Sequence, residues 1–415
     1  MPDETITWGG WDDATAADPY PLFESLRSRC PVHDVRLADG HDAALVLGHD
    51  AAARALMDKR LSKDMLAALA ENPEVADEGL PGPAFARHML AVDPPDHTRL
   101  RRLLAKAFLP SRVNALAPSI ETLTDELLDD LEALGPDGEV DLVEHFAHPL
   151  PFRVICELLG VPREVRPDLH RSFRVLFRPW SGSPPPEAVA ASATIVTTLE
   201  DLVAIHRTAH RDSLVGLLVA ESDEEDALTE QELLSSLFQL IVAGHDTTTS
   251  LIGNGVVDLL DNPGQLRWLL DDLTRMPAAV EELIRFSAPV PHATFRVTTD
   301  RTEIGGVQIP AGRQVLISLA SANRDASVYA AADDLDLART GPRHLGFGHG
   351  IHFCLGAPLA RLEGRIAFTS LFSRFPGLRL AGDRDELRWS HGDGLVLRGL
   401  DRLPVRLGRP HRAPS

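Results

Sequence analysis

The chain contains few cysteines, and they lie far apart. Its 415 residues include only Cys30, Cys156 and Cys354, and no two of them form a C-x-x-C pair. This pattern excludes a disulfide framework and is typical of a protein from a reducing cytoplasm. The first twenty residues contain no basic segment followed by an apolar run, so we expect neither a signal peptide nor a membrane anchor.

Positive charge is also scarce. The chain has 61 acidic residues against 41 Lys and Arg, which gives a formal net charge of −20. A nucleic-acid-binding protein would carry a basic balance, so we expect no nucleic-acid partner. The hydrophobic share of 44% and the charged share of 25% are those of a soluble globular protein whose core can enclose a sizeable ligand. We expect a cytoplasmic monomer.

Helical patterns dominate the chain. The longest runs from Thr229, which forms a capping box with Glu232, to Asn262, where Pro263 ends it. A second pattern with apolar residues three and four positions apart covers 109–134. Strand-like stretches are short and fall at about 31–48, 296–318 and 386–406. We predict one mainly α domain over 1–415 with a minor β region.

The longest predicted helix contains a polar segment, "AGHDTTT", at Ala243–Thr249. Glycine and threonine are weak helix formers, and a buried aspartate costs several kcal/mol unless it is paired. Two interpretations stay open at this point. The segment is either a polar kink satisfied by its neighbours or a groove in which Asp246 and a threonine hydroxyl face a reacting ligand.

Two other helices carry charged residues at helical spacing. Glu282 and Arg285 lie three residues apart, which by itself predicts an ordinary ion pair. Asp96 is predicted to cap a helix with His97 and Arg101 on one face. Arg99, Arg102 and Lys106 project from the other face. One cationic face would suit a buried anion and the other an acidic partner, and solvated surface charge is the alternative.

The segment "LGFGHGIHFCLGAPLAR" places Cys354 ahead of an amphipathic helix. Three interpretations compete: a buried thiol, a zinc site with His349 and His352, and a thiolate ligand to a larger group. The glycine spacing does not fit a dinucleotide-binding loop, and zinc lacks an evident fourth ligand. A glycine-rich loop that ends in a cysteine at a helix N-terminus favours thiolate, which haem iron accepts.

Taken together, these motifs resemble those of the cytochrome P450 family, the haem-thiolate monooxygenases, in particular the soluble bacterial type that hydroxylates macrolides and other polyketides. Phe347, Gly350, Cys354 and Gly356 fit the family's F-x-x-G-x-x-x-C-x-G loop. "AGHDT" fits its oxygen-activating helix, and "EELIR" fits its E-x-x-R helix. The resemblance implies the mainly α, triangular-prism-like P450 fold, with haem b buried between helices.

The resemblance also implies roles for individual residues. Cys354 would bind the iron, and Asp246 and Thr247 would guide protons during dioxygen activation. Glu282 and Arg285 would form a structural pair behind the haem, and Asp334 aligns with a position that often completes this network. The remaining cofactor-binding residues would be the propionate ligands His97, Arg101, Arg296 and His352, together with Phe347 and Gly348 in the cysteine loop.

The sequence indicates the substrate and the partner proteins only by class. By family position the substrate pocket would include Ala243, Val290, His292, Ala293, Thr294 and Leu395. Small, apolar lining suits a bulky, largely apolar molecule, oxidised by hydroxylation or epoxidation. The family resemblance implies a ferredoxin and its reductase as electron donors, docking near Arg99, Arg102 and Lys106. The alternatives are a peroxide-driven peroxygenase, a non-catalytic haem sensor and a zinc hydrolase.

Overall fold

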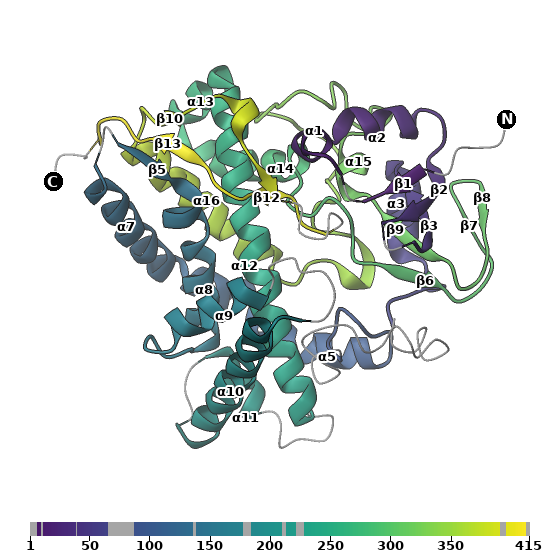
Figure 1. The fold of residues 1–415 in the computed structure, drawn as a ribbon, viewed down its shortest axis with the longest axis horizontal. Coiled ribbons are helices and arrows are strands. Elements are labelled where there is room, and N and C mark those ends of the chain that lie inside the picture. Colours follow the sequence, from purple (N-terminus) through teal and green to yellow (C-terminus); the bar gives the residue numbers. More distant parts are fainter. Residues whose placement is uncertain are drawn as a thin grey trace. The chain divides into compact units, whose positions relative to one another are not determined.

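The computed structural model describes residues 6–9, 11–38, 40–64, 87–135, 138–176, 184–209, 213–220, 228–390 and 396–411. The chain divides into two compact units. Unit 1 comprises Met1–Leu61, Ala117–Pro151 and Asp246–Ser415, and unit 2 comprises Ser62–Leu116 and Phe152–His245. Helices predominate over strands in both units, and the fold is mainly α, as predicted (Figure 1). That the whole chain forms one domain stays a prediction.

Unit 1 contains the main sheet, which joins strands from distant parts of the sequence. Its strands run in the order β1-β2-β3-β9-β6. They are β1 (Ile6–Trp8), β2 (Val32–Leu37), β3 (Asp42–Val46), β9 (Gln314–Ile317) and β6 (Arg296–Thr298). β2 and β3 form an antiparallel hairpin, and β3 then pairs parallel with β9. This confirms strands within the predicted stretches 31–48 and 296–318.

The side chains of these strands point alternately to the two faces of the sheet and pack into a separate hydrophobic core on each face. Ala44 and Val46 of β3 face one core, which α3 (His49–Met57) and α15 (Leu319–Asn323) cover. Ala43 and Leu45 face the other, beside Trp8 and the buried residues of α2 (Tyr20–Arg27). Successive strand residues point to opposite faces, so one short strand contributes to both cores.

Small antiparallel pairs complete the β structure of unit 1. β13 (Pro404–Arg406) pairs with both β10 (Arg379–Leu380) and β5 (Glu139–Asp141). β11 (Trp389–Ser390) pairs with β12 (Gly399–Leu400), and β7 (Thr302–Ile304) pairs with β8 (Val307–Ile309). β11, β12 and β13 lie within the third predicted strand region, 386–406, of which 391–395 lie outside the described residues. The two-residue strand β4 (Leu61–Ser62) marks the boundary between the units.

The helices of unit 1 carry or adjoin most of the predicted functional motifs. α14 (Met276–Phe286) carries the E-x-x-R pair, and α16 (Ala357–Arg374), which follows the cysteine loop, packs against α14. The others are α1 (Asp13–Ala17), α7 (Ala117–Ala133) and α13 (Pro263–Leu270), with short helical turns at Val143–Ala147, Leu273–Arg275, Gly350–His352 and Arg384–Glu386.

The described part of unit 2 is mostly helical, and it includes α12 (Glu230–Asp261) as far as His245. Its helices are α5 (Asp96–Ala105), α6 (Pro110–Ala115), α8 (Pro149–Leu159), α9 (Arg166–Leu176), α10 (Pro186–Ala209) and α11 (Leu214–Ala220), with a short turn at Lys106–Phe108. The first three residues of α8 belong to unit 1. α10 packs against both α9 and α11 (Figure 1).

Helix α10 is apolar and long enough to cross a membrane, with a mean hydropathy of 1.6 over its most apolar window, of which 39% is buried. Its burial is one-sided, however: Ala188, Ala191, Ile195, Leu199 and Leu202 repeat at three- and four-residue steps. A stripe of this kind is what a helix shows when one face packs on a protein body. We therefore interpret α10 as a packed helix of unit 2.

Helix α12 (Glu230–Asp261) begins and ends where the sequence predicts. The Thr229 N–H donates to Oε2 of Glu232 (2.9 Å), and the Glu232 N–H donates to Oγ1 of Thr229 (3.2 Å). This reciprocal pair is a capping box and satisfies two N–H groups that the first turn would leave unbonded. Pro263 is the first residue of α13. The capping box and the stop at Pro263 are both confirmed.

Two local predictions need correction. The pattern over 109–134 forms two helices, because α6 ends at Ala115 and α7 begins at Ala117, ahead of Pro118. Proline has no N–H to donate and fits best in the first turn of a new helix. Asp96 is the first residue of α5 and not its cap; its carboxylate accepts from Arg87 at 2.9 Å.

Candidate active site

Cys354 lies in a tight loop directly before α16. Its N–H donates to the carbonyl of Phe347 (2.9 Å), and Gly348 and Gly350 adopt left-handed φ angles of 71° and 75°. A Cβ at Gly350 would lie 3.0 Å from the carbonyl oxygen of Leu56, so glycine is needed there for both conformation and space. The loop leaves the Cys354 side chain exposed, where a ligand can reach it.

Two helices support this loop through the ring of Phe347. The guanidinium carbon of Arg361, on α16, lies 4.4 Å from the centre of that ring. Arg361 also donates twice to Glu281 of α14, at 2.6 and 2.9 Å. The ion pair therefore holds a cation against the aromatic face and joins α14, the loop and α16. The sequence analysis missed this pair, because 80 residues separate its members.

The other two cysteines are poor ligands. Cys156 is fully buried in α8, and burial raises the pKa of its thiol to about 12. A thiol with such a pKa stays protonated at neutral pH and neither binds metal nor attacks an electrophile. Cys30 is half-buried. Among the three cysteines, only Cys354 combines exposure with a position ahead of a helix.

The polar segment at Ala243–Thr249 does not break α12, which is helical from Glu230 to Asp261. Burial raises the pKa of Asp246 to about 6. A carboxyl group with a pKa close to neutral can both accept and release a proton at physiological pH, which suits a proton-transfer role. Thr247 follows directly, so an acid and a hydroxyl are neighbours on this helix.

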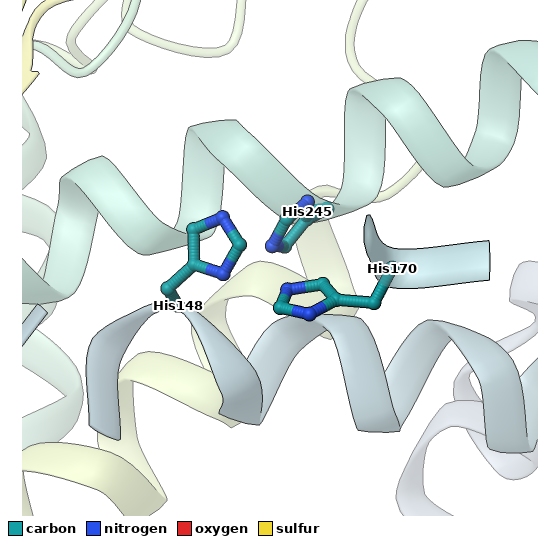
Figure 2. A group of neighbouring side chains, drawn as sticks. All are labelled: His148, His170 and His245. Atoms are coloured by element: carbon teal, nitrogen blue, oxygen red, sulfur yellow. The ribbon is translucent and has the colours of Figure 1, made fainter. Parts of the chain in front are cut away.

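His245 precedes this pair and lies at the end of unit 2's part of α12. Its ring lies edge-on to Phe152 and to His170, with ring centres 5.4 and 5.8 Å apart. Figure 2 shows His245 on its helix with His170 of α9, and also labels His148, which belongs to unit 1. The side chain is only 4% exposed. Packing of this kind favours a core histidine over a proton relay.

Glu282 and Arg285 form a buried ion pair on α14. Arg285 donates through Nε and a terminal nitrogen to the two carboxylate oxygens of Glu282, at 2.7 and 2.8 Å. Its other terminal nitrogen donates to the carbonyls of Asn323 (2.9 Å) and Ala332 (2.7 Å). The pair thus links α14 to the last residue of α15 and to the segment that follows it, and it is not a solvated surface pair.

The third member of this network is Arg339, which the sequence analysis did not identify. Arg339 donates from Nε to Glu282 (3.1 Å) and from its terminal nitrogens to the carbonyls of Ala330, Ala331 and Asp334. Asp334 takes part only through its backbone carbonyl, which also accepts from Arg285 at 3.1 Å. The carboxylate of Asp334 therefore does not replace the third member.

The four predicted propionate ligands divide between the units. In unit 2, His97 is buried and Arg101 half-buried on successive turns of α5. In unit 1, Arg296 is buried at the start of β6, and His352 is half-buried two residues before Cys354. Each is a cation or hydrogen-bond donor that is at least half-buried, and such groups pair with carboxylates through charge-assisted hydrogen bonds.

The predicted pocket residues occupy different environments. Ala243 is exposed on α12, whereas Val290 and Ala293 pack against the core beside α3. Thr294 is half-buried, and Leu395 lies outside the described residues. His292 is fully buried among Trp8, Trp11 and Phe23, with ring centres 5.7 to 6.0 Å away. This placement favours a structural histidine over one that contacts substrate.

The predicted docking residues are not equivalent either. Arg99 donates to both carboxylate oxygens of Glu232, the capping-box residue of α12. Its charge is therefore partly neutralised within unit 2. Arg102 and Lys106 are exposed.

Comparison with known proteins agrees with the motifs. The profile of the cytochrome P450 family matches residues 267–398. Cytochrome P450 107B1 of Saccharopolyspora erythraea is 43% identical over 96% of this chain and 97% of its own length. The 6-deoxyerythronolide B hydroxylase of the same organism is 41% identical over 95% and 97%. The tirandamycin C-bound P450 monooxygenase TamI is 40% identical over 97% of this chain and all of its own, with a TM-score of 0.86.

Proposed function

The chain belongs to the cytochrome P450 family and is a haem-dependent monooxygenase, and we propose that its substrate is a bulky, largely apolar natural product of the macrolide or polyketide type. Relatives of this similarity include polyketide and macrolide hydroxylases and epoxidases, which supports either outcome on this chain. The observation that supports the haem-thiolate assignment is the exposed thiol of Cys354, in a glycine-rich loop supported by two helices.

The residues fit haem b. Cys354 offers an accessible soft donor ahead of a helix N-terminus, and its loop has left-handed glycines that keep Cβ atoms away. Haem supplies the activation of dioxygen and the transfer of one oxygen atom to a C–H or C=C bond. We propose that His97, Arg101, Arg296 and His352 bind its propionates, and that Phe347 and Gly348 line the proximal loop.

The chain's own contribution to the reaction would be proton transfer. We propose that Asp246, whose pKa of about 6 lets it exchange protons near neutral pH, passes them inward, and that the Thr247 hydroxyl positions them at the reacting oxygen. Ala243, Val290, Ala293 and Thr294 would line the substrate pocket together with Leu395. His292 would contribute indirectly, by packing.

The carbon monoxide spectrum of the reduced protein tests the iron ligand. The parent should show the strongly red-shifted Soret band of thiolate-bound haem, and Cys354→His should lose it, because imidazole replaces the thiolate. Cys156→Ser is the matched control, since that thiol is buried, and it should keep the band. A parent without haem, or an unchanged spectrum in Cys354→His, would overturn the assignment.

Electrons must reach the haem from a redox partner, and we propose an acidic ferredoxin with its reductase, in the cytoplasm. Arg99, Arg102 and Lys106 would form the docking patch, of which Arg102 and Lys106 are the exposed members. The double variant Arg102→Glu with Lys106→Glu should slow reduction by ferredoxin steeply at low salt. Carbon monoxide binding after dithionite should not change. If ferredoxin reduces the parent and the double variant at equal rates, these residues do not form the docking surface.

A further inference from the structure

Glu281 of α14 lies at the centre of a charged cluster to which the proposed reaction assigns no role. Arg361 of α16 donates to both of its carboxylate oxygens, at 2.6 and 2.9 Å. Nε2 of His344 lies 3.3 Å from Oε2 of the same carboxylate. All three residues belong to unit 1, and His344 directly precedes the cysteine loop. We call Glu281, His344 and Arg361 the loop anchor.

The hydrogen bonds of His344 fix the position of its proton. The Gly346 N–H points at Nδ1 of His344 over 3.0 Å, so this nitrogen accepts, because a backbone N–H can only donate. The neutral imidazole then carries its hydrogen on Nε2, which donates to Glu281. A Cβ at Gly346 would lie 2.6 Å from Cγ2 of Ile284, so the loop backbone packs directly on α14. His344 therefore connects the carboxylate to the backbone of the loop.

The second arm of the loop anchor reaches the next residue of the loop. Arg361 lies 4.4 Å from the ring centre of Phe347, and the His344 ring lies beside the same ring, with centres 5.7 Å apart. The carbonyl of Phe347 accepts from the Cys354 N–H at 2.9 Å. The two arms thus end on Gly346 and Phe347, and the second of these is bonded to the backbone of Cys354.

The loop anchor is ionic, whereas another contact of the loop is neutral. Partial burial alone would raise the pKa of Glu281, but hydrogen bonds from His344 and Arg361 outweigh it and lower the pKa to about 2. The carboxylate therefore stays ionised at neutral pH, and charge-assisted bonds are about twice as strong as neutral ones. The neutral contact is the bond from the Leu345 N–H to Oδ1 of Asn323, at 2.7 Å.

From these two converging arms we propose that Glu281 is a positioning residue, which holds the cysteine loop through His344 and Arg361 so that the thiolate of Cys354 stays bound to the haem iron. This inference rests on the proposed role of Cys354. Groups that hold a metal ligand in place typically contribute tenfold or more to metal affinity or activity. Without the charge of Glu281, the loop should move more easily and the iron should lose its thiolate sooner.

The carbon monoxide spectrum of the reduced, haem-loaded protein, followed over time in mild urea, tests the proposal. In Glu281→Gln the strongly red-shifted Soret band should decay roughly tenfold faster than in the parent, because an uncharged amide binds Arg361 weakly. Glu132→Gln is the matched control. Glu132 accepts from Arg374, the last residue of α16, at 3.2 and 2.6 Å. This variant loses the same charge away from the loop and should decay as the parent does.

Variants of the other two members distinguish positioning from general loosening, and they keep the test open if Glu281→Gln does not fold. Arg361→Lys keeps a cation beside Phe347 and should decay more slowly than Arg361→Met, which has none. His344→Asn places an amide oxygen near the position of Nδ1 and should decay more slowly than His344→Leu. In Glu281→Gln the midpoint of urea unfolding should stay close to that of the parent.

The outcomes separate this proposal from the one on which it rests. Equal decay in the parent and in Glu281→Gln would overturn the positioning role. Decay in Glu132→Gln as fast as in Glu281→Gln, or equal decay in Arg361→Lys and Arg361→Met, would also overturn it. A parent that never shows the red-shifted band would instead overturn the ligation of iron by Cys354.

Discussion

Two clusters of buried charge in unit 1 differ in how completely their hydrogen bonds are satisfied. Around Glu282, both carboxylate oxygens accept from arginine, and the N–H of Asp336 adds a further bond at 2.9 Å. Around Asp258, Arg324 and Arg398 bond instead to backbone carbonyls, to the Ser287 hydroxyl and to Asp333. One carboxyl oxygen of Asp258 receives no hydrogen bond from any residue that the structure describes. The cluster around Glu282, here called the closed cluster, stabilises one backbone arrangement, whereas the cluster around Asp258, here called the open cluster, leaves a buried oxygen unsatisfied.

Removal of the charge of Glu282, the anion of the closed cluster, should give the largest loss in the free energy of unfolding. Glu282→Gln leaves Arg285 and Arg339 without their anion, and removing one partner of a buried pair costs about 3–5 kcal/mol. Urea unfolding of the haem-loaded protein measures this loss. Glu281→Gln is the control one residue away: Glu281 is 39% exposed, so its loss should cost about 1 kcal/mol or less. Similar losses in the two variants would mean that burial does not distinguish the pairs.

Removing the outer member of the closed cluster should cost less. Arg339→Ala removes one bond to Glu282 and the bonds to the carbonyls of Ala330, Ala331 and Asp334, while the Glu282–Arg285 pair remains. We expect a loss of about 1–3 kcal/mol in the free energy of unfolding. Amide hydrogen exchange should also become faster in the segment around Ala331. A loss within experimental error would place Arg339 outside the network.

The open cluster should instead show itself through pH. Burial raises the pKa of Asp258 to about 7, against about 3.9 in an unfolded chain. Its contribution to stability is therefore complete below pH 4 and is lost as the pH rises through 7, because the unfolded chain ionises first. Between pH 5 and pH 8 the melting temperature of the parent should fall more than that of Asp258→Asn. Parallel falls would show that Asp258 titrates normally.

The difference between the clusters also shows what the sequence can and cannot predict. The capping box of Thr229 and Glu232, the helix stop at Pro263 and the Glu282–Arg285 pair follow from spacings of a few residues, so local periodicity finds them. Arg339 lies 57 residues from Glu282, and its position depends on a turn at Ala331, whose φ is +46°. No periodicity encodes that turn. Tyr20, Asp258 and Arg398 are likewise distant in sequence, and only the fold brings them to the walls of one cavity.

Asp334 gives the smallest expected effect and the sharpest test of the closed cluster. Its exposed carboxylate takes no part in the network, whereas its carbonyl accepts from Arg285 (3.1 Å) and Arg339 (3.0 Å). Asp334→Ala keeps that carbonyl, so the free energy of unfolding should change by no more than about 0.5 kcal/mol. Asp334→Pro should be clearly worse, because it removes the N–H that donates to Ala331 at 3.0 Å and restrains the backbone of the same turn. If Asp334→Ala destabilises the protein as much as Arg339→Ala does, the carboxylate of Asp334 is a member of the closed cluster, in addition to its backbone carbonyl.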